Sequence, residues 1–571
     1  MQYRFVKQQP PHVGIDSQTK KMRDNGKNQV LRFVLIALLL QGSAIYTNAL
    51  PRSQKSSRET LKMKSQTPKS SFGVSSSMNL NPRNKNLSTR GGGIPAPVQP
   101  SLSALSKFYF PCLALWTAQP LLSLVDTATV GLSAKPGEGA IQLGSLGPAT
   151  TFIDGATYLF AFLNVATTNL YASAQAEQRP EKCESVVRTS GKISLLCGVF
   201  LIGLLFSAGK SLLTLYMGSE AAKTLLTPAT NYIWIRALSM PTTLWYGVIQ
   251  ASLLGAKDSL TPVIAILYST VVNVVGDISL VKGLGMGVQG AAIATVLAQF
   301  AGTGAMVGPA KKRLVNIENA GIGSLLVTPK NSPSKLPEDE VSSSSFLKFA
   351  APVLTLILGK LAAFGFMTHV AAAVPGQPTS LAAHQIVLSL FFFISPFLEV
   401  MSQTAQTFLP QFYQNEEWAD EANILASRML RLGLCLGAII SCVAGSIPRF
   451  FPWILTKDAV IWDAVRPLAS PLIISGLLTA PVAVSEGVLL ARRELKYLAS
   501  VYLLSTALLP KVLLKIKTNG SENGVVEVWT CFAYFQLFRA LCFTGKLWGG
   551  RIWNKVFSSG KSKPVAPSEI K

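Results

Sequence analysis

Apolar runs of about 20 residues, separated by short polar joints, recur along most of this 571-residue chain, and a run of that length can cross a bilayer as a helix. Only 14% of the residues are charged, whereas soluble chains carry about a quarter. In hydrocarbon the backbone must satisfy its own hydrogen bonds, and a helix does so within one segment. The sequence therefore predicts an all-α, polytopic membrane protein.

We count twelve candidate spans in two sets of six, which are predicted to form two pseudo-symmetric lobes. The first set comprises residues 108–132, 146–172, 189–217, 225–254, 261–281 and 288–308. The second set comprises residues 346–374, 380–409, 427–447, 467–490, 497–514 and 525–547.

The two sets resemble copies of each other, because three short motifs recur at a spacing of about 230 to 237 positions. The motif pairs are Ile235–Pro241 with Val465–Pro471, Leu253–Asp258 with Leu489–Glu494, and Gly287–Gln299 with Gly524–Gln536. Copies that each contain an even number of spans share one orientation in the membrane. This arrangement predicts a substrate cavity between the two lobes.

The first hundred residues have the composition of targeting sequences. A short apolar core at Phe33–Leu40 is followed by Thr47–Ala49, as in a signal peptide. Residues 50–107 are rich in Ser, Lys and Arg and contain Glu59 as their only acid, as in a transit peptide. The order resembles the bipartite presequences of algae with secondary plastids and predicts the plastid envelope. An uncleaved tail, or a plasma or vacuolar membrane location, is the alternative.

These features divide the chain into six predicted parts. They are a signal peptide-like segment at 1–49, a transit peptide-like segment at 50–103, the N-lobe at 104–308, an inter-lobe loop at 309–345, the C-lobe at 346–550 and a basic tail at 551–571.

The net charge of +24 lies largely in the N-terminal hundred residues, the 311–313 run and the C-terminal tail. No soluble module presents this charge to a nucleic acid, so we expect none as a partner. One predicted side of the membrane carries Arg179, Lys182, residues 311–313, Arg492 and Arg493. By the positive-inside rule this side is cytoplasmic, or stromal in a plastid.

One acidic residue lies within the first span. Asp126 is the only charged residue between Phe108 and Leu132, and an ionised carboxylate at that depth costs several kcal/mol. A carboxyl that stays protonated there, and loses its proton when its surroundings change, can couple proton movement to a change in the protein. Asp126 therefore predicts proton-coupled transport, and Pro120 gives the same helix a place to bend.

A second polar group follows in the fifth and sixth spans. Asn273 and Asp277 are four residues apart and share one helix face, unless Asp277 simply marks the span's end beside Lys282. Thr295 can add a hydroxyl to the same cavity. The small residues around Thr295 allow close helix packing, which is a sufficient reason for this motif without a functional role.

Two further candidates for transport lie in the second span, Asn164 and Asp154. Asp154 can equally lie at the membrane interface. Arg236 and Arg466 occupy equivalent positions in the two sets, which suggests that both anchor their helices at the interface.

The C-lobe contains membrane-embedded acids and bases of its own. Glu399 and Glu486 are the acids, and Lys360 and Arg539 are their expected partners in structural ion pairs. We expect no cofactor and no metal site, because the seven cysteines form no CxxC motif and lie mostly in apolar runs. No nearby Cys or carboxylate completes a ligand set with the two membrane histidines.

Across about residues 104–550 the chain resembles the multidrug and toxic compound extrusion (MATE) transporters, specifically their DinF-like branch. The motifs that carry the resemblance are residues 120–131, 246–262, 273–277, 287–295 and 381–386. The resemblance implies a monomeric secondary antiporter with two six-helix lobes in a V.

The resemblance implies that the acid of the family's first lobe corresponds to Asp126. The polar partners of that acid correspond to Asn273, Asp277 and Thr295. Another branch places a coupling acid in span seven, where this chain has Lys360 but no acid. Plant relatives of the branch include chloroplast-envelope exporters of aromatic carboxylic acids, which agrees with the presequence.

We therefore expect an antiporter that exports drug-like or aromatic organic solutes in exchange for protons, with Na⁺ as the alternative coupling ion. The expected partners are the solute and the lipid bilayer. An enzyme is not expected, because the sequence shows no nucleophile–base or metal constellation. The alternatives are a flippase for a lipid-linked precursor and a non-transporting membrane scaffold.

Overall fold

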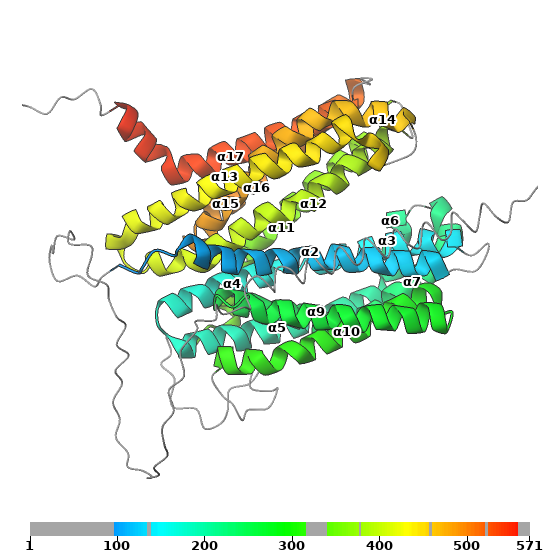
Figure 1. Cartoon of the computed structure of the whole chain (residues 1–571), viewed down its shortest axis with the longest axis horizontal. Coiled ribbons are helices and arrows are strands. Elements are labelled where there is room, and N and C mark those ends of the chain that lie inside the picture. Colours follow the sequence, from blue (N-terminus) through cyan, green and yellow to red (C-terminus); the bar gives the residue numbers. More distant parts are fainter. Residues whose placement is uncertain are drawn as a thin grey trace, which may run out of the picture.

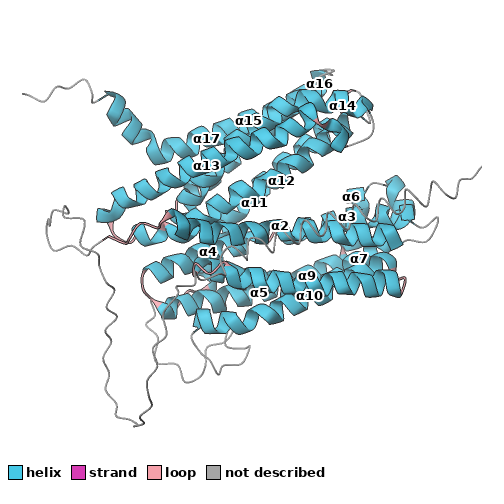
Figure 2. Cartoon of the chain, viewed as in Figure 1, coloured by secondary structure: helices cyan, strands magenta, loops and turns pink. Residues whose placement is uncertain are grey.

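The computed structural model describes residues 96–133, 139–217, 219–315, 340–375, 379–455, 459–519 and 524–557. Within these residues every regular element is a helix and no strand occurs (Figure 2). The predicted signal peptide-like segment, most of the transit peptide-like segment and the last residues of the basic tail lie outside the described residues, as does much of the inter-lobe loop.

The N-lobe is built from six spans, two of which are interrupted. Its helices are α2 (Leu102–Ser133), α3 (Gly139–Tyr158), α4 (Ala161–Ala176), α5 (Pro180–Ser207), α6 (Gly209–Met217), α7 (Ser219–Ala237), α8 (Met240–Gly255), α9 (Leu260–Gly276) with the π-helix η1 (Asp277–Gly283), and α10 (Gly287–Ala310) with η2 (Lys311–Val315).

The second and fourth predicted spans are each divided into two helices, α3 with α4 and α7 with α8. The third predicted span, 189–217, differs in its limits, because α5 starts earlier, at Pro180, and ends at Ser207. Proline at the first helical position and Glu181 in the first turn both favour a helix start there. The helix thus extends beyond the apolar run that marked the span.

The C-lobe has the same order of elements. Its helices are α11 (Ser343–Ala371), α12 (Thr379–Phe408), α13 (Ala419–Phe450), α14 (Ala459–Val465), α15 (Ala469–Ala491), α16 (Leu495–Asn519) and α17 (Gly524–Phe557). In the described residues nine segments are long and apolar enough to cross a membrane. With α2 and the interrupted pairs α3–α4 and α7–α8 they make up twelve spans, so the predicted fold class is confirmed.

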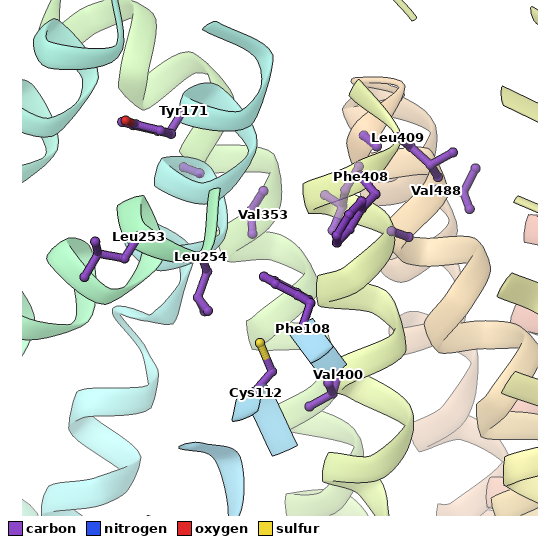
Figure 3. Packing of buried hydrophobic residues seen from close by; sticks show 14 of the residues in the cluster. Phe108, Cys112, Tyr171, Leu253, Leu254, Val353, Val400, Phe408, Leu409 and Val488 are labelled. Atoms are coloured by element: carbon purple, nitrogen blue, oxygen red, sulfur yellow. The ribbon is translucent and has the colours of Figure 1, made fainter. Parts of the chain in front are cut away.

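The two lobes meet at one end, here called the closed end, where α2 begins and α4, α8 and α12 finish (Figure 1). An apolar cluster from both lobes packs there, with Phe108 of α2 edge-on to Phe408 of α12 at a ring distance of 5.4 Å (Figure 3). Away from this end each lobe has its own cluster, around Tyr232 in the N-lobe and Trp529 in the C-lobe. The lobes therefore diverge like a V.

Polar contacts between the lobes reinforce the closed end. Asn169 on α4 donates from Nδ2 to Gln406 Oε1 on α12 at 2.7 Å, and both side chains are buried. Lys257, just after α8, donates to Gln411 Oε1 at 2.8 Å. Lys257 and its repeat counterpart Arg493, after α15, both have positive φ, at 63° and 59°.

The duplicated motifs make equivalent contacts in the two lobes. In the N-lobe, Thr243 on α8 donates to Gln299 Oε1 on α10 at 2.8 Å. In the C-lobe, Gln536 on α17 donates to Thr479 Oγ1 on α15 at 2.6 Å. The two pairs are about 236 positions apart in the sequence, so the predicted internal repeat is visible in the packing of the helices.

Close packing of α5 on α8 gives a stability prediction. A Cβ at buried Gly198 would lie 2.6 Å from the Pro241 nitrogen, which belongs to the backbone and cannot rotate away. We expect Gly198→Ala to lower the stability of the N-lobe by about 1–3 kcal/mol. The matched control is Gly203→Ala in the same helix, where nothing lies within 4 Å of the new Cβ. Thermal melting in detergent tests both, and equal melting temperatures would contradict the prediction.

Candidate functional site

Four of the predicted site residues come together inside the N-lobe and are called the N-lobe cluster: Asp126 on α2, Asn273 on α9, Asp277 at the start of η1, and Thr295 on α10. Asp126, Asn273 and Asp277 are 4%, 1% and 0% exposed. Thr295 Oγ1 lies 3.3 Å from Asp126 Oδ2. Asn273 and Asp277 are also close enough for their side chains to interact with the Asp126 carboxyl.

Several polar atoms of the N-lobe cluster have no hydrogen-bond partner. They are Asp126 Oδ1, both amide atoms of Asn273, and both carboxyl oxygens of Asp277. Leaving a buried donor or acceptor unpaired costs about 1–3 kcal/mol. A group of such atoms in one place is therefore a site prepared for something else, such as a proton, an ion or water.

The Thr295 hydroxyl indicates where a proton fits. It lies 2.8 Å from the carbonyl oxygen of Ala291 and 3.3 Å from Asp126 Oδ2. A hydroxyl has one proton to donate, and the shorter contact uses it. The longer contact is then a full hydrogen bond only when Asp126 is protonated and donates to Thr295. The geometry can distinguish the two protonation states of Asp126.

The backbone around Asp277 explains how this carboxyl reaches the cluster. Gly276 lets α9 approach α10 closely, because a Cβ at this position would be 2.8 Å from the Cβ of Ala294. Directly after it the helix changes from α to π geometry, at Asp277, a feature that is common at functional sites. Asp277 is fully buried, whereas Lys282 is exposed. Asp277 therefore does not simply mark the end of the span beside Lys282.

Arg236 belongs to the same region, although the sequence suggested an anchor at the interface. It lies in the last turn of α7 and is 7% exposed. Its Nη2 is 3.8 Å from Asp154 Oδ1, its Nη1 is 3.4 Å from the Tyr232 hydroxyl, and its Nε has no partner. Its charge also acts on Asp126. The position of Arg236 inside the predicted span 225–254 was the signal that it belongs to a functional site, since a charge inside a span is a functional candidate.

The structure places the two candidates of the second span differently. Asp154, near the end of α3, has a side chain that is 63% exposed and pairs with Arg236. Asn164, on α4, is half-buried and packs against Gly247 of α8, where a Cβ would be 2.9 Å from its Oδ1. Only Asp154 thus contacts Arg236, the residue whose charge acts on Asp126 of the N-lobe cluster.

The C-lobe acids and bases form a separate group, the C-lobe cluster. Lys360 Nζ lies 3.1 Å from Glu399 Oε1 and 3.1 Å from Glu486 Oε1, and Tyr502 donates to Glu486 Oε2 at 2.5 Å. The expected pairing of Lys360 with both acids is therefore present. Arg539 differs from the expectation, because it donates to the neighbouring Gln536 and its guanidinium lies over aromatic rings.

The repeat does not duplicate the N-lobe cluster. Asn273, Asp277 and Thr295 have counterparts in the C-lobe about 236 positions later in the sequence. These counterparts are Leu509, Leu513 and Phe532. All three are buried in the apolar cluster of the C-lobe. The lobes have the same fold, but only the N-lobe encloses an acidic dyad of this kind in the described residues.

Comparison with known proteins identifies the family to which the chain belongs. Residues 111–278 match the MatE family model. The chain is 30% identical over 450 residues to Protein DETOXIFICATION 47, chloroplastic, from Arabidopsis thaliana, which covers 78% of each chain. The chain belongs to the MATE family of membrane transporters. It is also 35% identical over 182 residues to DNA damage-inducible protein F of Escherichia coli, across 32% of this chain and 38% of that protein.

A solved MATE-like structure supports the fold. A MOP superfamily transporter from Pyrococcus furiosus superposes with a TM-score of 0.66 at 19% identity, over 80% of this chain and 96% of that one. This likeness concerns the fold alone. The resemblance to MATE transporters and their DinF-like branch is therefore confirmed, while the roles of the site residues remain predictions.

In this MATE transporter, the N-lobe cluster offers oxygen atoms from carboxyl, amide and hydroxyl groups, which a Na⁺ ion also accepts as ligands. The positive charge of Arg236 acts on the same carboxyl and opposes the binding of a proton or of another cation there. Among the described residues, no group of three or more His, Cys, Asp or Glu could hold a metal ion.

Proposed function

We propose that this MATE transporter is an antiporter that exports organic solutes in exchange for protons. The observation that carries the proposal is the pair of buried carboxyls, Asp126 and Asp277, with three of their four oxygens unpaired. Two carboxyls at one buried site do not both ionise readily, so they hold a proton between them. The N-lobe cluster is the proposed proton site.

The arrangement of the lobes supports alternating access. The lobes pack together at the closed end and have separate apolar clusters elsewhere. The closed end carries Arg179, the 311–313 run, Arg492 and Arg493, so we assign it to the cytoplasmic or stromal side. In the other state the lobes would separate at this end. A proton and a solute drive the exchange when each binds a different state more tightly.

We further propose organic solutes with an aromatic or drug-like body as substrates, and a plastid envelope as the membrane. The relative from Arabidopsis thaliana is a chloroplastic protein, and the presequence predicted here agrees with that location. Coupling to Na⁺ is the alternative.

Uptake into proteoliposomes tests the proposal. The purified full chain is reconstituted, and uptake of ethidium, an organic cation, and of benzoate, an aromatic acid, is measured. A pH gradient or a Na⁺ gradient is imposed in turn. We expect the pH gradient alone to drive uptake of at least one probe above the level in vesicles without protein, into which benzoic acid itself diffuses. Uptake driven only by Na⁺, or equally fast without a gradient, would refute proton coupling.

Alternating access gives a prediction for the closed end. Asn169→Leu removes the buried hydrogen bond to Gln406 and leaves its Oε1 unpaired, which destabilises the closed end by about 1–3 kcal/mol. Cys112 is fully buried in the shared apolar cluster and reports on opening (Figure 3). With Cys112 as the only cysteine, we expect Asn169→Leu to raise its rate of maleimide labelling about tenfold.

The matched control for this experiment is Gln414→Leu. Gln414 donates to Pro410 within its own lobe, so its loss should leave the labelling rate of Cys112 unchanged. Equal labelling rates for Asn169→Leu and the control would show that the hydrogen bond between the lobes does not hold this end closed.

A further inference from the structure

A polar stripe runs along one face of the second half of α3. Thr151, Asp154 and Tyr158 are exposed, and their spacing of three and four residues places them on one side of the helix. A face that meets lipid tails is expected to be apolar. The polar character of this stripe therefore indicates contact with water or solute.

The far end of the stripe shows which way it faces. Tyr158 feels the charges of Lys360, Glu399 and Glu486, which all belong to the C-lobe. Tyr158 is itself 40% exposed, so it does not lie inside the packing of either lobe. The Tyr158 end of the stripe thus lies toward the C-lobe, and the exposed Asp154 lies one turn before it on the same face.

Behind Asp154 lies a buried guanidinium with loose contacts. Arg236 is 3.8 Å from Asp154 and 3.4 Å from the Tyr232 hydroxyl, and its Nε has no partner. The charge of Arg236 also acts on Asp126, whose Oδ1 has no partner. One guanidinium therefore pairs with the Asp154 carboxyl and acts on a second carboxyl, at Asp126.

The surrounding backbone allows movement at this point. Asp154 lies one turn before the interruption between α3 and α4, and Arg236 lies just before the interruption between α7 and α8. Interruptions of this kind are where helices bend. A change of partner by Arg236 can therefore alter the angle of two spans that reach the closed end.

We propose that Asp154 binds the cationic group of the transported solute, and that Arg236 transmits this binding to the proton site at Asp126. This inference rests on the proposed antiport and adds the link between its two ligands. When a cation pairs with Asp154, Arg236 is displaced toward Asp126 and stabilises its ionised form. The proton then leaves, so solute and proton exclude each other, as antiport requires.

The charge that can be reached from the space between the lobes decides the class of ligand. The Asp154 side chain is 63% exposed, whereas the side chain of Arg236 is 9% exposed. A solute therefore meets a carboxylate first and is recognised through a positive group. The other ionisable group that interacts with Arg236 is the Tyr232 hydroxyl.

Binding and proton release can be measured together on the full chain in weakly buffered detergent solution. Ethidium is the probe, because it is a permanent cation with no proton of its own to lose in this pH range. We expect the wild type to release protons into solution as ethidium binds. Asp154→Asn should weaken ethidium binding about tenfold or more, while benzoate binding stays unchanged.

Arg236→Gln is the decisive variant. It should still bind ethidium but release few or no protons, whereas Arg236→Lys, which keeps the charge, should recover part of the release. The matched control is Arg466→Gln in the C-lobe. Arg466 pairs with Asp463 at the surface, so this variant should affect neither readout. Melting temperatures identify any variant that fails to fold, and Arg236→Lys then carries the test.

Three results would overturn the relay: full proton release by Arg236→Gln, wild-type ethidium affinity in Asp154→Asn, or no ethidium binding by the wild type. Failure of the antiport itself is different, because the wild type would then release no protons and a pH gradient would drive uptake of neither probe. If pH-driven uptake persists while Arg236→Gln remains coupled, only the relay is wrong.

Discussion

Asp126→Asn is expected to reduce pH-driven uptake to the level of empty vesicles while the protein stays folded. The amide has nearly the same shape as the carboxyl and can still contact Thr295, but it cannot exchange a proton near neutral pH. We expect the stability to change by about 1 kcal/mol or less, because a neutral amide replaces a buried carboxyl that we expect to be protonated. Initial rates of uptake and thermal melting of the same preparation measure both effects.

The control for Asp126→Asn is Asp463→Asn. Asp463 is an exposed acid that pairs with Arg466 at the surface of the C-lobe, so its loss should leave uptake at the wild-type rate. Wild-type uptake by Asp126→Asn would show that the proton binds elsewhere. It would also favour a scaffold or another transport mechanism for the N-lobe.

The second large effect is expected in the C-lobe. Lys360→Met removes the ammonium that Glu399 and Glu486 share at 3.1 Å each. Glu486 is buried, whereas the side chains of Lys360 and Glu399 are 20% and 24% exposed. Removing the shared cation leaves charge that solvent compensates only in part, which costs about 1–3 kcal/mol. We expect a clear drop in melting temperature, because the two carboxylates lose the cation that lies between them.

Two comparisons separate this explanation from a general loss of packing. The double variant Lys360→Met with Glu486→Gln removes one of the stranded charges and should recover part of the stability. Lys546→Met breaks an exposed pair with Glu494 and should cost little, since exposed pairs contribute about 0–1 kcal/mol. A drop for Lys360→Met that the added Glu486→Gln does not rescue would contradict the electrostatic account.

The number and order of spans could be predicted because apolar runs of bilayer length are a strong signal. The interruptions after Tyr158 and Ala237 could not be predicted, because the apolar runs continue through them. The shift of α5 toward Pro180 has the same cause, since helices extend beyond the hydrocarbon while hydropathy does not. Packing against neighbouring helices decides these limits, and it is not visible in one segment of sequence.

The N-lobe cluster was predictable to a different degree at each residue. Asp126 stood out because a charge far inside an apolar span is costly, and the spacing of Asn273 and Asp277 put them on one face. The resemblance to MATE transporters then joined Thr295 to these residues. Their contact depends on how α2, α9 and α10 pack, which only the structure shows.

Arg236 was misinterpreted because its repeat counterpart gave a false guide. Arg466 is 44% exposed by its side chain and pairs with Asp463 at the surface, as an interface anchor would. Arg236 is buried and pairs with Asp154. Duplicated segments keep their backbone while their side chains diverge, so an equivalent position does not guarantee an equivalent environment.

The most direct test of the account follows the proton itself. Proteoliposomes that contain the wild-type protein and the pH-sensitive dye pyranine are placed in weak buffer without Na⁺, and ethidium is added outside. If the protein exchanges organic cations for protons, ethidium entry will raise the pH inside the vesicles, and Asp126→Asn will show no such rise. Ethidium entry at constant internal pH, or entry that requires Na⁺, would contradict proton-coupled antiport.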